Sequence, residues 1–139
     1  MKKKKYILFS LGFLCLLLGL YGLKMFQMKR PALQSVPAQA KIEAETLYAA
    51  FNGNEDSANQ HYLNAVLEVS GEIVSVPGPK SHAILLSGGT ASLGGINCEL
   101  RDANHTWEKL KIGELITLKG RCTGYLMDVN LTDAVIVQN

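Results

Sequence analysis

The first part of the chain carries a long run of apolar positions. Residues 6–23 contain no charged side chain, and residues 24–26 continue the run with one lysine, whose amine can reach water while its stem stays in an apolar region. At about 1.5 Å of rise per helical residue, the run is long enough to cross a hydrocarbon core of about 30 Å. The pattern predicts a membrane-spanning helix over residues 6–26, which we interpret as an uncleaved signal anchor. A basic tail over residues 1–5 precedes it, and a proline-containing linker over residues 27–40 follows.

Apolar positions recur at helical spacing in residues 41–62. The sequence NGN at Asn52–Asn54 interrupts this pattern, so we predict one helix that ends near Phe51 and a second that starts near Glu55. The aromatic residues of this region are Tyr48, Phe51 and Tyr62. They could form a ligand-binding stripe, but a helix face docked on a core is the more common arrangement.

From Asn64 onward apolar and polar positions alternate, which is typical of half-buried strands. Five segments show the alternation: residues 67–76, 82–87, 96–100, 114–122 and 126–137. In the last segment Met127, Val129 and Leu131 share one side, and the register becomes less clear near Asp133. Between the third and fourth segments, residues 102–111 predict a short helix.

Five short strands cannot bury their apolar faces as a small flat sheet, whereas a sheet closed on itself buries one face and removes exposed edges. The order of three strands, a helix and two strands is that of an OB-fold barrel. Gly71 and Gly120 suit strands that coil sharply. We therefore predict a mainly β protein, in which a five-stranded OB-fold barrel with an N-terminal helical extension occupies residues 41–139, after the single transmembrane helix.

Three stretches resemble a known family: AFNGNEDSANQHYLNAVLEVSGEI at residues 50–73, INCEL at residues 96–100, and LKIGELITLKGRCTGYLMDVNLTDAVIV at residues 110–137. The chain is similar there to the OB-fold family known as tRNA-anti-like, over about residues 42–138. The resemblance implies the barrel fold, but most members have no assigned function, and the family name does not establish tRNA binding. The last strand carries Ala134 where a cysteine could stand, so a role for a cysteine at that position is absent here.

Charge is divided unevenly along the chain. Residues 1–40 hold seven Lys and Arg side chains and no acid, whereas residues 41–139 hold seven basic and twelve acidic ones, which gives +7 and 7 − 12 = −5. More basic residues precede the apolar run than follow it, which predicts a single-pass protein of the cell membrane with a cytoplasmic N-terminus and an extracytoplasmic domain. The excess positive charge lies beside the apolar run and not on the predicted barrel. The overall basic pI is therefore no argument that the barrel binds nucleic acid.

Two cysteines of the predicted barrel, Cys98 and Cys122, fall on inward positions. In an exported domain they could form a disulfide that closes a loop of about 25 residues and contributes about 2–4 kcal/mol. The third and fourth strands are not usual neighbours in an OB topology, which argues against a bridge. The alternative is that both thiols are free and buried, where each takes the place of a small apolar side chain.

We predict no metal site, no cofactor and no enzymatic activity. Zinc sites have closely spaced ligand pairs, and the nearest approach in this sequence is Cys98 to His105. Inward-facing cysteines lack the access that a nucleophile needs. The stretch GGTASLGG at Gly88–Gly95 lacks the Gly-Lys-Ser/Thr ending of a phosphate-binding loop and predicts a flexible connection. The outward carboxylates of three strand residues, Glu68, Glu72 and Glu99, predict a solvated face.

OB barrels usually bind ligands on the face of the second and third strands and with the loops after the first and fourth. Those regions offer these candidates for ligand contacts: Lys80, His82, Asn97, Arg101, Thr123 and Tyr125. Single-stranded nucleic acid needs a basic groove with stacking aromatic side chains. The candidates include few cations, and the domain has a charge of −5, so the electrostatics argue against nucleic-acid binding. We expect a non-catalytic, membrane-anchored module that contacts an envelope protein or a small ligand. Binding of single-stranded oligonucleotides is the alternative.

Overall fold

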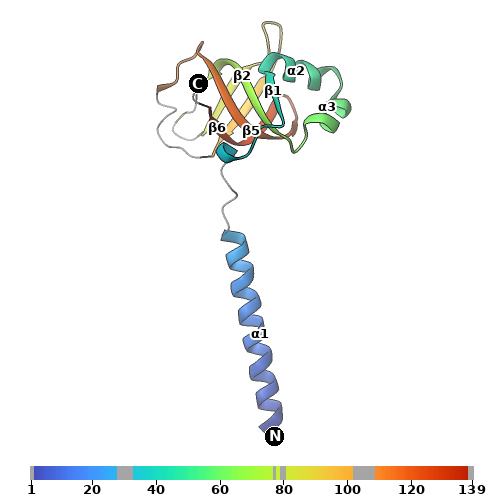
Figure 1. Ribbon diagram of the computed structural model, residues 1–139, viewed down its shortest axis with the longest axis vertical. Coiled ribbons are helices and arrows are strands. Elements are labelled where there is room, and N and C mark those ends of the chain that lie inside the picture. Colours follow the sequence, from blue (N-terminus) through green and yellow to red (C-terminus); the bar gives the residue numbers. More distant parts are fainter. Residues whose placement is uncertain (1, 28–32, 77, 79–80, 102–108, 138–139) are drawn as a thin grey trace. The chain divides into compact units, whose positions relative to one another are not determined.

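The computed structural model describes residues 2–27, 33–76, 78, 81–101 and 109–137. Contacts between residues divide the chain into two compact units, Met1–Pro31 and Ala32–Asn139. Figure 1 shows a single helix in the first unit and a β-barrel with short helices in the second. All residues of the hydrophobic core lie in the second unit.

The helix of the first unit, α1, spans Lys2–Gln27 and confirms that the apolar run is helical. The structure describes its side chains except those of residues 2–9, 11 and 27. Among the described residues, no helix combines the length and the apolar character that a membrane crossing requires. The membrane-spanning helix expected over residues 6–26 is therefore not supported.

The second unit contains a closed barrel of five strands. They are β2 (Val66–Ser75), β3 (Ala83–Ser87), β4 (Gly95–Leu100), β5 (Leu115–Tyr125) and β6 (Val129–Ile136). The order β2-β3-β4-β6-β5 closes because β2 pairs with β5 as well as with β3, and only the β4–β6 pair among the five is parallel. This order confirms the predicted OB-fold barrel. Most of the helix predicted at residues 102–111 falls on residues 102–108, outside the described part.

Four further elements precede the barrel strands: η1 (Leu33–Ser35), β1 (Ala40–Glu43), α2 (Ala44–Gly53) and α3 (Glu55–Tyr62). The two helices confirm the predicted break. Asn54 ends α2, and its side-chain oxygen accepts a hydrogen bond from the Ser57 N–H at 3.0 Å, which caps the start of α3. Strand β1 was not predicted, because its four residues are too few to show a period. It pairs in parallel with β2.

Alternate residues of the strands fill the barrel, as the sequence pattern predicts. Fully buried positions include Leu67, Val69 and Ile73 on β2 and their counterparts on the other strands. From α2, Leu47 and Phe51 join the same core cluster. The aromatic positions of this region therefore belong to a helix face docked on the core, and the ligand-stripe interpretation is wrong for them.

The last strand differs from its predicted register at both ends. Met127 is 68% exposed, because β6 begins only at Val129 and Met127 lies in the preceding turn. Asp133 has a left-handed backbone with φ of +54°, and the pairing of β6 with both neighbours shifts register around it. This bulge changes the inward parity, so that Leu131 is followed inside the barrel by Ala134.

Cys98 and Cys122 are both buried and both free. The register explains why they are not bridged: Leu131 of β6 pairs with Cys98 on one side and with Cys122 on the other. Two strand spacings separate the cysteines by about 9–10 Å, beyond the span of a disulfide. Burial raises the pKa of both thiols, so each remains a neutral, apolar filler of the core.

The glycine-rich connection between β3 and β4 is an ordered loop and not the flexible link expected from its composition. The Ser92 hydroxyl lies 2.7 Å from the Gly89 carbonyl oxygen and 2.8 Å from that of Gly94. The Gly95 N–H donates to Asp128 Oδ1 at 2.7 Å, which ties this loop to the β5–β6 turn. Hydrogen bonds therefore hold this loop in one conformation, although its glycine-rich sequence predicts conformational flexibility.

Candidate functional site

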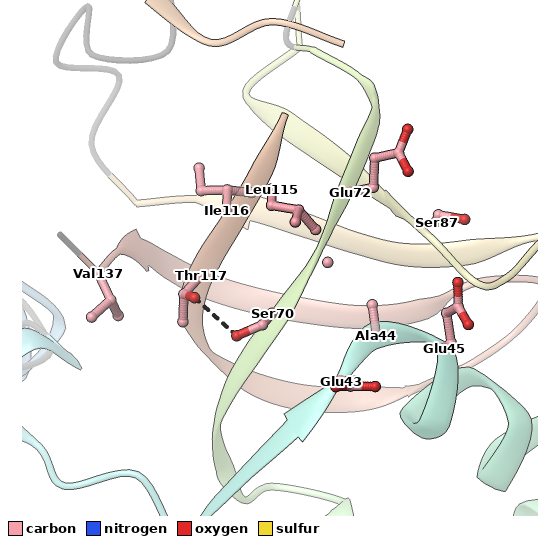
Figure 2. Close-up of a pocket in the computed structure, with 11 residues that line it drawn as sticks. Glu43, Ala44, Glu45, Ser70, Glu72, Ser87, Leu115, Ile116, Thr117 and Val137 are labelled. Carbon is pink, nitrogen blue, oxygen red and sulfur yellow. Dashed lines mark hydrogen bonds between the residues drawn. The ribbon is translucent and has the colours of Figure 1, made fainter. Parts of the chain in front are cut away.

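A hollow lies where β1 and α2 meet the outer surface of the β2–β5 pair (Figure 2). It has a volume of about 650 Å³. We call it the acidic groove. Its lining residues are Glu43, Ala44, Glu45, Ser70, Gly71, Glu72, Ser87, Leu115, Ile116, Thr117 and Val137.

The groove depends on a glycine in the middle of β2. A Cβ atom at Gly71 would lie 2.6 Å from the Ala44 Cβ and 3.3 Å from the Leu86 Cβ. Real Cβ atoms do not approach so closely, so a side chain at Gly71 would push the first turn of α2 away from the barrel. The small residues Gly71 and Ala44 thereby bring Glu43 and Glu45 to the edge of the β2–β5 pair.

The charged groups of the groove have one sign. Figure 2 shows the carboxylates of Glu43 and Glu45 near the start of α2 and that of Glu72 on β2. The described lining contains no Lys, Arg or His. All three glutamates are exposed, so their charge acts through solvent and is sensitive to salt.

Apolar side chains also line the groove. Leu115, the first residue of β5, pairs with Glu72 at the end of the β2–β5 ladder and is 80% exposed. Ile116 and Val137 extend this apolar lining. On the floor, the hydroxyls of Ser70 and Thr117 lie 2.9 Å apart in a hydrogen bond. The groove can therefore hold a cation beside an apolar group.

None of the residues that line the acidic groove was predicted as a site residue. Glu68, Glu72 and Glu99 were expected to be solvated, which the exposed positions of Glu72 and Glu99 confirm, whereas Glu68 is half-buried. Glu68 forms an ion pair with Lys41 at 2.9 Å, Glu99 is exposed on β4, and Glu72 lines the groove. Glu43, Glu45 and Leu115 were missed, because only the tertiary contact at Gly71 brings α2 beside β5. The one signal in the sequence for a close contact here was Gly71, a glycine inside a strand with polar residues on both sides.

The structure distributes the six predicted ligand residues over several places. Lys80 lies outside the described residues. His82 is exposed, and its carbonyl accepts the Leu100 N–H at 2.8 Å; Arg101 is half-buried beside β6, where its N–H donates to the Ala134 carbonyl at 3.1 Å. Neither His82 nor Arg101 lines the acidic groove.

Two of the predicted residues, Asn97 and Thr123, are hydrogen-bonded to Asn130 of β6. The Asn97 side-chain amide donates to Asn130 Oδ1 at 3.0 Å, and the Thr123 hydroxyl donates to the Asn130 carbonyl at 3.2 Å. Thr123, Tyr125 and Asn130 line a second hollow of about 440 Å³, which we call the Tyr125 pocket. Its other lining residues are Glu55, Asn59, Leu63, Gly124 and Leu126.

Tyr125 is held in place by internal packing. Its ring lies 5.8 Å from that of Phe51 in a stacked arrangement and 6.0 Å from that of Tyr48 edge-on. Its hydroxyl donates to Asn52 Oδ1 at 3.2 Å. Hydrogen bonding with Tyr48, desolvation and the negative charges of Glu55 and Asp128 raise the pKa of Tyr125.

Cations near the barrel strands are engaged with the protein itself. The Lys119 amine donates to the Val36 carbonyl at 3.2 Å, and the Arg121 guanidinium donates to the Asn64 carbonyl at 2.7 Å. These bonds hold the chain segments around η1 and the start of β2 against β5.

Metal-ligating side chains do not gather in the described part of the chain, where no group of three or more His, Cys, Asp and Glu residues could hold an ion. His105, the nearest histidine to Cys98 in the sequence, lies outside the described residues.

Comparison with known proteins yields a family and a fold. A family model described as tRNA_anti-like matches residues 1–136. No curated protein matches the sequence. A solved structure with a similar fold is described as a "putative nucleic acid-binding lipoprotein" from Klebsiella pneumoniae subsp. pneumoniae MGH 78578. It is 17% identical, the match covers 81% of this chain and 100% of that chain, and the TM-score is 0.55. A likeness at this identity concerns the fold alone.

Proposed function

We propose, from the premise that this chain belongs to the tRNA_anti-like family of OB-fold domains, that it is a non-catalytic binding module whose ligand occupies the acidic groove. The single observation that carries the proposal is the composition of this groove. Three carboxylates share the groove with the exposed side chain of Leu115, and the described lining supplies no positive charge to neutralise them. The ligand is then a cationic protein segment or small molecule with an apolar part.

The groove supports a binding role by its chemistry. Carboxylates near apolar side chains suit a Lys or Arg side chain, whose stem covers apolar surface while its charged end meets the glutamates. Each exposed ion pair contributes about 0.2–1 kcal/mol, so specificity would come from the three carboxylates together with the contact to Leu115.

Changing Glu72 to Gln should weaken the binding of a fluorescein-labelled oligolysine peptide about twofold to fivefold, because one of three attractive charges is lost. Fluorescence anisotropy at low salt, on the full chain in phosphatidylcholine nanodiscs, measures the Kd. Glu99→Gln is the matched control, since it removes the same charge from an exposed strand position outside the groove. Equal weakening by both variants would show that only the overall charge of the domain attracts the peptide.

Binding of single-stranded nucleic acid is the second candidate, because the family and the fold neighbour both carry names that refer to nucleic acids. The same anisotropy measurement with RNA and DNA oligonucleotides of about ten nucleotides separates the two candidates. Tight binding whose affinity falls steeply with salt would favour nucleic acid over the cationic ligand.

We also propose that the N-terminal part attaches the module to a membrane, with the barrel on the extracytoplasmic side. The apolar run, the preceding lysines and the name of the fold neighbour, a lipoprotein, support this.

Membrane attachment predicts that the full chain sediments with membranes after alkaline carbonate washing and that external protease removes the barrel from spheroplasts. A variant that lacks residues 1–31 should be released into the soluble fraction, because it keeps only the second compact unit. Release of the full chain by the alkaline wash would contradict the attachment. Protection of the barrel from external protease would contradict its side.

A further inference from the structure

We propose that the joined loops beside the Tyr125 pocket form a second docking surface, for a partner protein that presents a large apolar side chain next to a Lys or Arg. This loop tip consists of Leu93 in the β3–β4 loop and of Leu126 and Met127 in the β5–β6 turn. It uses none of the residues that line the acidic groove and does not depend on the function proposed above.

The first observation is the exposure of these side chains. Leu93 is 97% exposed, Leu126 is 91% exposed, and Met127 is also largely open to solvent. Leu63, at the end of α3, is partly exposed and lines the Tyr125 pocket together with Leu126. A gathering of large apolar side chains on the surface of a small domain is typical of an interaction site.

The second observation is that the two loops are fixed to each other. Asp128 Oδ1 accepts the Gly95 N–H at 2.7 Å, and Gly94 packs directly against the Met127 carbonyl and the Asp128 carboxylate. Ser92 holds the β3–β4 loop through the carbonyls of Gly89 and Gly94. A partner that binds to loops already ordered in this way loses less conformational entropy than one that must order them.

The third observation is the shape beside the loop tip. The Tyr125 pocket, of about 440 Å³, has Leu63 and Leu126 on its sides and the polar groups of Thr123 and Asn130 in its lining. Tyr125 is fixed by Phe51 and Tyr48, so this wall of the pocket is preformed. A concave site with apolar sides is suited to an anchoring side chain such as Leu or Phe.

The fourth observation is the charge, which decides between occupants. The only charged residue in the described lining of the pocket is Glu55, and the carboxylate of Asp128 lies at the loop junction. These negative groups complement a basic residue and repel anionic lipid headgroups. The chemistry thus favours a protein segment with an apolar anchor and a neighbouring cation over a bilayer surface.

The test uses a fluorescein-labelled synthetic peptide of alternating Lys and Leu, with the full chain in phosphatidylcholine nanodiscs. Leu126→Ser should weaken its binding about tenfold, because the exposed leucine loses its contact with the anchor. Ile112→Ser is the matched control: it replaces a largely exposed aliphatic side chain, 67% open to solvent, that lines neither the acidic groove nor the Tyr125 pocket. Neither change should shift the unfolding midpoint, since both side chains are largely exposed.

Two further measurements make the result decisive. A peptide in which Glu replaces every Lys should bind at least tenfold more weakly, and a photoreactive amino acid in place of Leu126 should crosslink to the Lys-Leu peptide. Equal effects of Leu126→Ser and Ile112→Ser, or equal affinity for the Glu-containing peptide, would overturn the proposal. Crosslinks to lipid in place of peptide would assign the loop tip to the membrane instead.

Discussion

Replacing Gly95 by alanine is expected to lower the free energy of unfolding by about 3 kcal/mol or more, at the upper end of the cost of overpacking. A Cβ atom at this position would overlap the backbone carbonyl oxygen of Leu86 on β3. A side chain can rotate away from such a contact, but a backbone carbonyl held in a strand pair cannot. The pairing of Ser87 with Gly95 and the bond from Gly95 to Asp128 would both be disturbed.

Urea unfolding of the barrel, followed by circular dichroism, measures this loss. Gly53→Ala is the matched control, because a Cβ at this helical position meets no atom within 4 Å. That change should leave stability unchanged or raise it by up to about 1 kcal/mol, since alanine favours the helix more than glycine does. A Gly95→Ala protein as stable as the unmodified chain would contradict the register of β3 and β4.

Phe51→Ala should cost about 3–5 kcal/mol, the usual range for removing a buried aromatic ring. Phe51 is 1% exposed and contacts two other aromatic rings, with centroids 6.1 Å away at Tyr62 and 5.8 Å away at Tyr125. Its removal would leave a cavity between α2 and the barrel and would release Tyr125, which forms a wall of the Tyr125 pocket. The loop tip should then lose affinity for the Lys-Leu peptide as well.

Phe51→Leu serves as the control, because leucine keeps most of the apolar volume and should cost less than about 1.5 kcal/mol. Near-ultraviolet circular dichroism reports whether the remaining tyrosines keep their packing. A loss below about 1 kcal/mol for Phe51→Ala would indicate that this ring faces solvent, as a ligand-binding stripe would require.

The core of the barrel could be predicted because burial and strand periodicity act on each residue locally. Val69, Ile73 and Leu118 are inward in the alternating pattern, and all are fully buried in the structure. The same reasoning placed Cys98 and Cys122 inside. It could not decide whether they are bridged, because that depends on which strand lies between them. Leu131 of β6 occupies that place.

Most of the candidate sites could not be predicted, because they join residues that are distant in the sequence. The acidic groove needs Glu43 and Glu45 from the start of α2, Glu72 from β2 and Leu115 from β5. Of the six predicted ligand residues, only Thr123 and Tyr125 line a described pocket, and Tyr125 is used there as a packed wall. The bond between Gly95 and Asp128, which forms the loop tip, links two turns that are unrelated in the sequence.

The sequence by itself determined the helical character of the N-terminal run, the two short helices separated at Asn54, the positions of the five barrel strands along the chain and most of the inward residues of β2, β4 and β5. These properties follow from local periodicity and capping, which neighbouring residues encode directly. Only the tertiary structure decided that β1 adds to the barrel, that Asp133 shifts the register of β6, and that the groove and the loop tip exist. Each of these depends on close packing between elements that are distant in the sequence. At Gly71 and Gly95 the absence of a Cβ atom allows two elements to approach closely, and a side chain there would keep them apart.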